Sequence, residues 1–209
     1  MSYYGLLLNM KTAKNLWILS SLMINVVIGI YIYLQQNAPK NLEERFQYIN
    51  DNWAMYGGHW KAEFLVMTLM LIGAIYFMMY WKSMSWTIIS VGQLIVLLTY
   101  PIMLGGYENT PFELANMANQ IATITFIFGN VIFFLGITLL YLKAHILQPW
   151  LRYVAILLSI GATLLFTSVF IGLITWNQVI VIAPLINILY LINAYYIYKI
   201  PSEFQSTRT

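Results

Sequence analysis

The chain alternates between long apolar stretches and short polar segments. A helix that crosses the hydrocarbon core of a bilayer needs about 20 mostly apolar residues. These stretches are too long for strands and lack their alternation of apolar and polar residues, and an open sheet cannot satisfy its backbone polar groups in lipid. The pattern predicts an all-α, polytopic integral membrane protein, a six-transmembrane-helix bundle forming a single domain over residues 1–209. The predicted spans are roughly residues 16–34, 64–81, 86–104, 121–142, 151–174 and 179–200.

The composition agrees with lipid as the main solvent. Hydrophobic residues make up 61% of the chain and charged residues 8%, whereas soluble domains carry about 25% charged residues. Cysteine is absent, which excludes disulfides, thiolate metal sites and iron–sulfur clusters. The first apolar stretch is too long for a cleavable signal peptide and no A-x-A site follows it, so we expect it to remain as a span.

The basic residues predict the orientation of the bundle. Short cytoplasmic loops are enriched in lysine and arginine, and seven of the ten basic residues fall on the side of the two termini. We therefore expect both termini to be cytoplasmic, with residues 1–15 cytoplasmic or interfacial and residues 201–209 forming a cytoplasmic tail. The seven are Lys11, Lys14, Lys82, Lys143, Arg152, Lys199 and Arg208, and the other three are Lys40, Arg45 and Lys61.

Residues 37–58, between the first two spans, predict a short extracytoplasmic helix that lies at the membrane interface. Asn41 can cap it, and Glu44 stands at the third helical position, which is a capping-box spacing. Apolar residues that follow at i+3 and i+4 spacing give it one hydrophobic face. We expect Gly57 and Gly58 to end this helix, because glycine adopts the left-handed closing conformation without strain.

Prolines mark further boundaries. In the segment NTPFELANMANQ, Thr110 is the expected cap of the fourth span, with Pro111 at its first position and Glu113 at its third. This helix should begin outside the membrane. Pro101 and Pro184 each remove a backbone donor inside a predicted span, so kinks are expected there, and a kink can either open a cavity or fit a neighbouring helix.

Neutral polar residues occupy the spans. No Asp, Glu, Lys, Arg or His lies in the central part of any predicted span, which argues against proton relays, ion-coupled carriers and voltage sensors. Amides and hydroxyls in hydrocarbon need partners, so they should face inward, either as hydrogen bonds between helices or as the lining of a ligand path. The candidate ligand-binding residues are Gln93, Tyr100, Asn130, Asn187 and Tyr190.

His59 and Glu63 stand one helical turn apart, at the expected outer mouth of the second span. Three interpretations are open for them: anchoring at the interface, an extracytoplasmic binding or gating surface, or acid–base chemistry. The spacing H-x-x-x-E lacks the second histidine of H-E-x-x-H, so no metal or other cofactor is predicted. The full candidate surface at the outer mouth is His59, Glu63, Asp51, Glu108 and Glu113.

One segment resembles a known family. Residues 130–165 place Gly136, Tyr141 and Lys143 before a short turn with Pro149, and Leu151, Arg152 and Gly161 after it. This arrangement is similar to a family of small bacterial six-helix membrane proteins of unknown function. The resemblance implies the same six-helix layout and a place in a bacterial inner membrane, and it carries no active site.

Three functions follow as hypotheses. The first is a non-enzymatic accessory or interaction subunit of a membrane assembly, because the spans lack buried charge and motifs. The second is a channel, carrier or binding protein for a neutral or lipophilic small molecule, and the third is a membrane enzyme that uses His59 and Glu63. The expected partners are membrane lipids and another membrane protein or a second copy of the chain, without nucleic acid. A pocket lined by the interior amides would distinguish the second hypothesis from the first.

Overall fold

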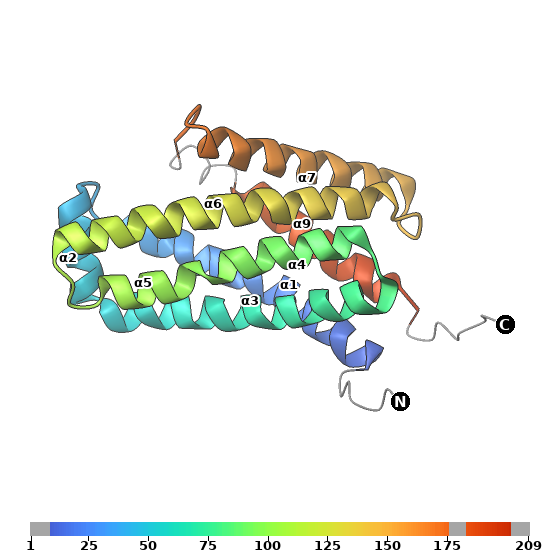
Figure 1. The fold of residues 1–209 in the computed structure, drawn as a ribbon, viewed down its shortest axis with the longest axis horizontal. Coiled ribbons are helices and arrows are strands. Elements are labelled where there is room, and N and C mark those ends of the chain that lie inside the picture. Colours follow the sequence, from blue (N-terminus) through green and yellow to red (C-terminus); the bar gives the residue numbers. More distant parts are fainter. Residues whose placement is uncertain (1–8, 176–182, 202–209) are drawn as a thin grey trace.

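The computed structural model describes residues 9–175 and 183–201, and these residues form a bundle of long helices (Figure 1). Within the described residues the secondary structure is entirely helical. The helices are α1 (Met10–Asn37), α2 (Leu42–Asp51), α3 (Trp53–Trp81), α4 (Met84–Leu97), α5 (Thr99–Tyr107), α6 (Phe112–Leu142), α7 (Pro149–Phe170) and α9 (Ala183–Lys199).

Five segments of the described chain are long and apolar enough to cross a membrane: α1, α3, α4 together with α5, α6, and α7. The chain is thus a helical protein of the multi-pass membrane type. With 31 residues, α6 is about 46 Å long at 1.5 Å per residue, which exceeds the hydrocarbon thickness of about 30 Å. The predicted sixth span covers α9, but its first residues lie outside the described chain.

The predicted end of the interfacial helix at Gly57 and Gly58 is wrong. Asn41 does cap α2, since its Oδ1 accepts hydrogen bonds from the backbone N–H groups of Glu43 at 3.0 Å and Glu44 at 3.2 Å. The helix ends at Asn52, whose side chain and backbone N–H both donate to the carbonyl of Tyr48. Both glycines then lie inside α3.

The side chain of Trp53 fills the space beside Gly57 in α3. A Cβ at Gly57 would lie 2.9 Å from the indole ring of Trp53, so the ring packs on the bare helix backbone. The second span therefore begins near Trp53 rather than at residue 64. His59 and Glu63 consequently belong to this long helix and not to a loop before it.

Proline explains the break between α4 and α5. Pro101 has no N–H to donate to the carbonyl of Leu97, and its ring would clash with that carbonyl in a regular helix. The break falls at Leu98, whose N–H turns to the carbonyl of Ile95 at 3.1 Å, while the Thr99 hydroxyl donates to the carbonyl of Val96 at 2.7 Å. The expected distortion near Pro101 is present. Pro184 lies at the second residue of α9 as described.

Two predicted helix ends need correction. Pro111 occupies the cap position of α6, which lacks a side-chain cap, because the Thr110 hydroxyl donates instead to the carbonyl of Glu108 at 3.1 Å. The fifth span ends at Phe170 rather than at residue 174. Gly172 has a φ of 78°, a left-handed conformation that terminates the helix.

The helices α4 and α6 form the most extensive contact of the bundle. A Cβ at Gly92 of α4 would lie 2.4 Å from the backbone nitrogen of Phe133, and a Cβ at Gly136 of α6 would lie 2.7 Å from the backbone nitrogen of Ile89. Glycine thus lets the two backbones approach closely. Such contacts between small residues hold membrane helices together, because lipid supplies no hydrophobic force between them.

Aromatic rings fill the core between α1, α3 and the start of α4. Trp86 contacts Trp17 with ring centroids 5.0 Å apart and Phe77 with centroids 4.7 Å apart. Phe77 also stacks on Trp81 at 4.8 Å. Trp17, Phe77 and Trp86 are each no more than 1% exposed, so this aromatic cluster is fully buried.

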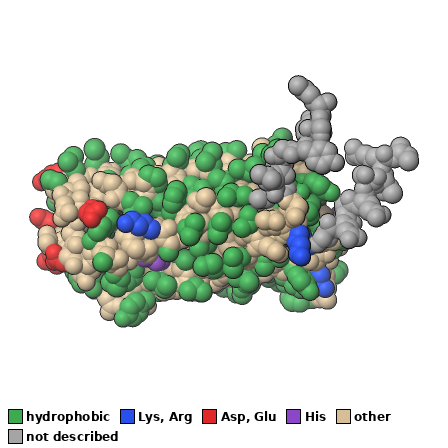
Figure 2. Space-filling view, turned by 90° about the horizontal axis from the view of Figure 1, so that it is seen from below, with side chains coloured by type: hydrophobic (Ala, Val, Ile, Leu, Met, Phe, Trp, Pro, Cys, Tyr) green, Lys and Arg blue, Asp and Glu red, His purple; other side chains and the backbone are tan. Residues whose placement is uncertain are grey.

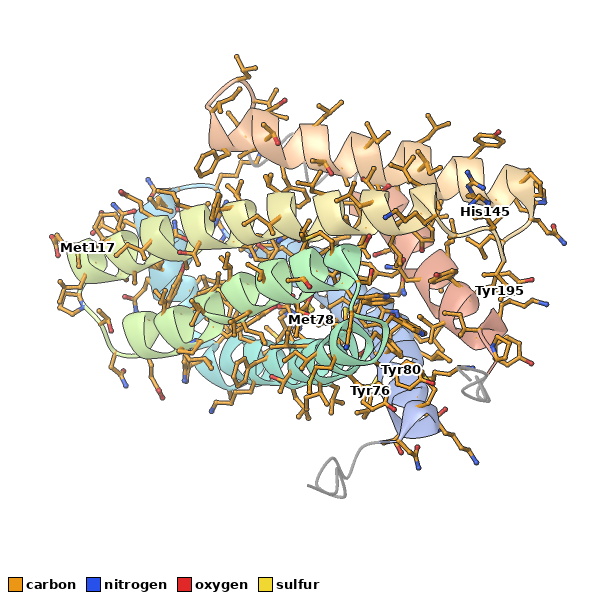
Figure 3. All side chains as sticks on the ribbon, turned by 45° about the vertical axis from the view of Figure 1, so that its right-hand side comes forward. Tyr76, Met78, Tyr80, Met117, His145 and Tyr195 are labelled. Carbon is orange, nitrogen blue, oxygen red and sulfur yellow. The ribbon has the colours of Figure 1, made fainter. Side chains whose placement is uncertain are left out.

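The two ends of the bundle differ. The start of α1, the turn from α3 to α4 and the end of α9 lie at one end, together with His145 in the turn after α6, whereas α2 and Met117 near the start of α6 lie at the other (Figures 1 and 3). Hydrophobic side chains cover the length of the visible side, and acidic residues gather at the α2 end (Figure 2). The α2 end holds the cavity described next.

Candidate ligand cavity

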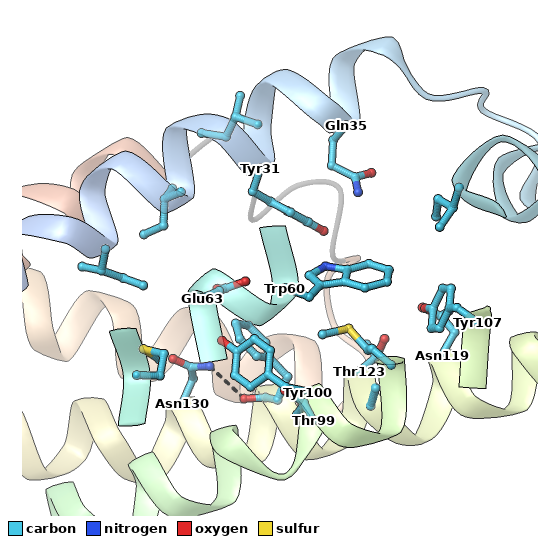
Figure 4. A pocket seen from close by; sticks show the side chains of 18 of the residues that line it. Tyr31, Gln35, Trp60, Glu63, Thr99, Tyr100, Tyr107, Asn119, Thr123 and Asn130 are labelled. Atoms are coloured by element: carbon cyan, nitrogen blue, oxygen red, sulfur yellow. Dashed lines mark hydrogen bonds between the residues drawn. The ribbon is translucent and has the colours of Figure 1, made fainter. Parts of the chain in front are cut away.

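A cavity of about 570 Å³ lies inside the α2 end of the bundle (Figure 4). Its walls come from α1, α3, α5 and α6, with one residue of α7 and two of α9, and α2 contributes the wall at the end of the bundle. Small-molecule sites occupy about 300–1,000 Å³ and are mainly apolar with a few polar groups. The size and the mixed lining of this cavity both fit that class of site.

The helix α3 presents one polar group into the cavity between two apolar ones. Trp60, Glu63 and Met67 are spaced i, i+3 and i+7, which places them on one face of a helix, and all three line the cavity. Glu63 lies ten residues into α3, about 15 Å along its axis. The carboxyl group of Glu63 therefore lies inside the bundle. The predicted span, which began at residue 64, had placed this group outside the bundle.

The helices α6 and α1 supply neutral polar groups. On α6, Asn119, Thr123 and Asn130 line the cavity at i, i+4 and i+11. On α1, Tyr31 and Gln35 point into the same space, toward Trp60 and Glu63 (Figure 4). The Asn130 amide donates to the carbonyl of Phe126 at 2.9 Å. This bond orients Asn130 and leaves the amide oxygen for another donor.

Glu63 is the centre of the polar lining. Its carboxylate oxygen lies 3.7 Å from Nε2 of His59. Among the described residues this is the one pair of acidic and basic groups within 4.0 Å. The pair is an ion pair only when the His59 imidazole is protonated. The side chains of Tyr100 and Tyr190 line the same cavity as this carboxylate. The buried Tyr100 hydroxyl makes no hydrogen bond of ordinary distance and angle with another described residue.

Exposure separates the two members of the ion pair. The His59 side chain is 3% exposed and does not line the cavity, whereas the Glu63 side chain is 16% exposed and does. His59 stacks instead against the ring of Tyr31, with centroids 6.1 Å apart. The carboxylate, and not the imidazole, is the group that a molecule in the cavity can reach.

The wall at the α2 end is fastened to the rest of the bundle. Phe46 of α2 packs against Tyr107 with ring centroids 5.0 Å apart, and the Tyr107 hydroxyl donates to Asn119 at 2.7 Å. The side chain of Asn50 accepts a hydrogen bond from the backbone of Asn109 at 3.0 Å. These contacts hold α2 over the cavity.

The residues expected to bind a ligand divide into two groups. Tyr100, Asn130 and Tyr190 line the cavity. Gln93 is fully buried outside it and donates to the carbonyl and the sulfur of Met67, both at 3.2 Å, so it joins α4 to α3. Asn187 is not part of the lining, and its Oδ1 is buried without a hydrogen-bond partner among the described residues.

The residues expected at the outer mouth also divide. Glu63 lines the cavity and His59 is buried behind it. Asp51, Glu108 and Glu113 are exposed and do not line it. No group of three or more His, Asp or Glu residues in the described chain is close enough to hold a metal ion.

Several lining residues were interpreted differently from the sequence. Tyr31 and Trp60 were not selected as candidate site residues, and Arg45 was counted only for its charge. The signal that could have revealed Trp60 is the i, i+3, i+7 pattern of Trp60, Glu63 and Met67, which lies wholly within α3 because this helix begins at Trp53. Comparison with protein-family models, with curated proteins and with solved structures finds no match to this chain. The resemblance of residues 130–165 therefore stays a prediction.

Proposed function

We propose that this protein is a non-enzymatic membrane protein that binds a lipophilic small molecule in the cavity between α1, α3, α5 and α6. The observation that carries the proposal is that interior polar residues, among them Asn130 and Tyr100, line one cavity of about 570 Å³ together with apolar side chains. Gln93, by contrast, is buried outside the cavity, and its amide donates to the carbonyl of Met67 and so joins α4 to α3.

The other two functions have weaker support. An accessory subunit needs a partner surface, but exposed apolar residues on these helices are also what lipid contact requires, so no observation favours it specifically. An enzyme that uses His59 needs the imidazole to reach a substrate, and this side chain is 3% exposed. Binding is the function that the geometry favours.

A cavity-filling variant tests the proposal. Ala122 lines the cavity and is buried, while Ala62 of α3 is exposed. We expect the full-length protein in nanodiscs to bind the neutral dye Nile red saturably, and Ala122→Trp to weaken this binding by about tenfold or more, a loss of at least 1.4 kcal/mol. Ala62→Trp should bind as the parent does. Saturable binding that is absent, or that is equal in both variants, contradicts the proposal.

We further propose that the chain crosses the membrane six times, with α9 in the sixth span, both termini in the cytoplasm and α2 outside. The support is twofold. The start of α1 and the end of α9 lie at the same end of the bundle, as an even number of crossings requires (Figure 1). The helix ends and turns at that end carry Lys11, Lys82, Lys143 and Lys199, as expected for the cytoplasmic side. Residence in a bacterial inner membrane remains a prediction.

The absence of cysteine makes this topology directly testable. Single cysteines at Ser83 and Gln148 should react with a membrane-impermeant maleimide only after the cells are opened. Single cysteines at Glu43 and Glu108, both exposed in the structure, should react in intact cells. The cysteine-free parent is the control for background. The reverse labelling pattern would contradict the proposed orientation.

A further inference from the structure

The charges of the cavity are arranged in a way that selects among ligands. Among the described residues that line it, Glu63 and Arg45 carry formal charge. Arg45 belongs to α2 at the end of the bundle, and its Nε donates to the carbonyl of Pro39 at 2.8 Å. No ion pair within 4.0 Å joins Arg45 to Glu63. Within the described residues, the carboxylate therefore has no basic partner within 4.0 Å in the cavity wall, and His59 lies behind it.

Aromatic rings surround this carboxylate. Tyr31, Trp60, Tyr100 and Tyr190 all line the cavity together with Glu63, and Tyr31 and Trp60 approach it from the side of α2 (Figure 4). The face of an aromatic ring attracts cations, most strongly when water is excluded. A carboxylate combined with several such faces is a site for a positive charge that is carried by an apolar body.

We propose that the ligand of this cavity is a lipophilic organic cation, such as an amine or quaternary ammonium with apolar substituents, and that Glu63 is its counter-ion. The inference rests on the proposed function, since it names the chemical class of the molecule that the cavity binds. The apolar body lies against residues such as Ile28, Met103 and Phe134, which line the rest of the cavity.

The position of Glu63 in the bundle gives it this role. An ionisable side chain inside a membrane helix bundle is costly and is usually paired or functional. The partner that the protein itself supplies is His59, at 3.7 Å and charged only when protonated. A ligand cation in the cavity reaches the exposed side of the same carboxylate and completes its neutralisation. A bare metal ion would lack further ligands there, because the described residues hold no cluster of three or more His, Asp or Glu.

Two probes of matched shape and opposite charge test this inference. Tetraphenylphosphonium and tetraphenylborate are both apolar and tetrahedral, and they differ in the sign of their charge. In nanodiscs containing the full chain, we expect tetraphenylphosphonium to displace Nile red at a concentration about tenfold lower than tetraphenylborate. Glu63→Gln should raise the tetraphenylphosphonium concentration needed, after correction for the variant's own affinity for Nile red, by about tenfold, a change of 1.4 kcal/mol in binding.

Glu113→Gln is the matched control, because it makes the same chemical change at an exposed residue outside the cavity, and it should behave as the parent. If tetraphenylborate displaces Nile red from the parent as well as tetraphenylphosphonium does, or better, the inference is overturned, and this result needs no variant. Unchanged displacement of Nile red by tetraphenylphosphonium in folded Glu63→Gln also overturns it. In both cases Nile red binding would still support the proposed function. Absence of saturable Nile red binding in the parent would overturn both.

Discussion

Replacing Phe77 by alanine should lower the free energy of unfolding by about 3–5 kcal/mol, the usual cost of removing a buried aromatic side chain. Phe77 is 0% exposed and contacts three tryptophans, at positions 17, 81 and 86. Its removal leaves a cavity among large rigid rings that cannot collapse into it. The measurement is equilibrium unfolding in mixed micelles of a mild detergent and sodium dodecyl sulfate.

Phe128→Ala is the matched control for this prediction. Phe128 is 43% exposed and makes a ring contact with Phe170, so we expect its loss to cost under about 1 kcal/mol, as for substitutions away from the core. Equal effects of the two substitutions would mean that the aromatic cluster does not hold this end of the bundle together.

Gly92→Ala should have the second largest effect. The added Cβ would lie 2.4 Å from a backbone nitrogen of α6, and a backbone cannot move aside as a flexible side chain can. Forcing the helices α4 and α6 apart should cost about 1–3 kcal/mol, the usual range for overpacking, although alanine has the higher helix propensity. The same unfolding assay measures this cost.

Gly161→Ala supplies the comparison, since no atom lies within 4 Å of the Cβ that it would add in α7. Only helix propensity then acts, so this variant should be unchanged or more stable by up to about 1 kcal/mol. If Gly92→Ala is as stable as Gly161→Ala, the close approach of α4 and α6 is not needed for folding.

The sequence predicted the helices well because length and apolar character decide them. The cap at Asn41 and the distortion near Pro101 were also predictable, since each depends on the chemistry of a few neighbouring residues. The boundary at Gly57 was not, because it depends on the ring of Trp53 lying against the helix backbone. A glycine pair is a helix end in one packing environment and a contact surface in another.

The candidate site was predictable in part, for a related reason. Tyr100, Asn130 and Tyr190 were selected because polar groups in lipid must face inward, and they do line the cavity. Glu63 was assigned to the membrane surface because its helix was expected to begin one residue later. The place of Glu63 in the cavity wall depends on the start of α3 at Trp53. Gln93 lies outside the cavity because its side chain contacts Met67 of the neighbouring helix α3. Neither follows from spacing along one segment.

The break at Leu98 divides the third span into α4 and α5, which have different surroundings. On the N-terminal side of this break, α4 packs on α6 through glycine residues, with the two backbones in close contact. On its C-terminal side, α5 borders the cavity. Between α4 and α5, one backbone hydrogen bond of a regular helix is missing because Pro101 has no N–H. The third span is thus continuous in its packing on α6, since Gly106 of α5 also lies close to Ala118 of α6, but it is interrupted in its own hydrogen bonding at the level where the cavity begins.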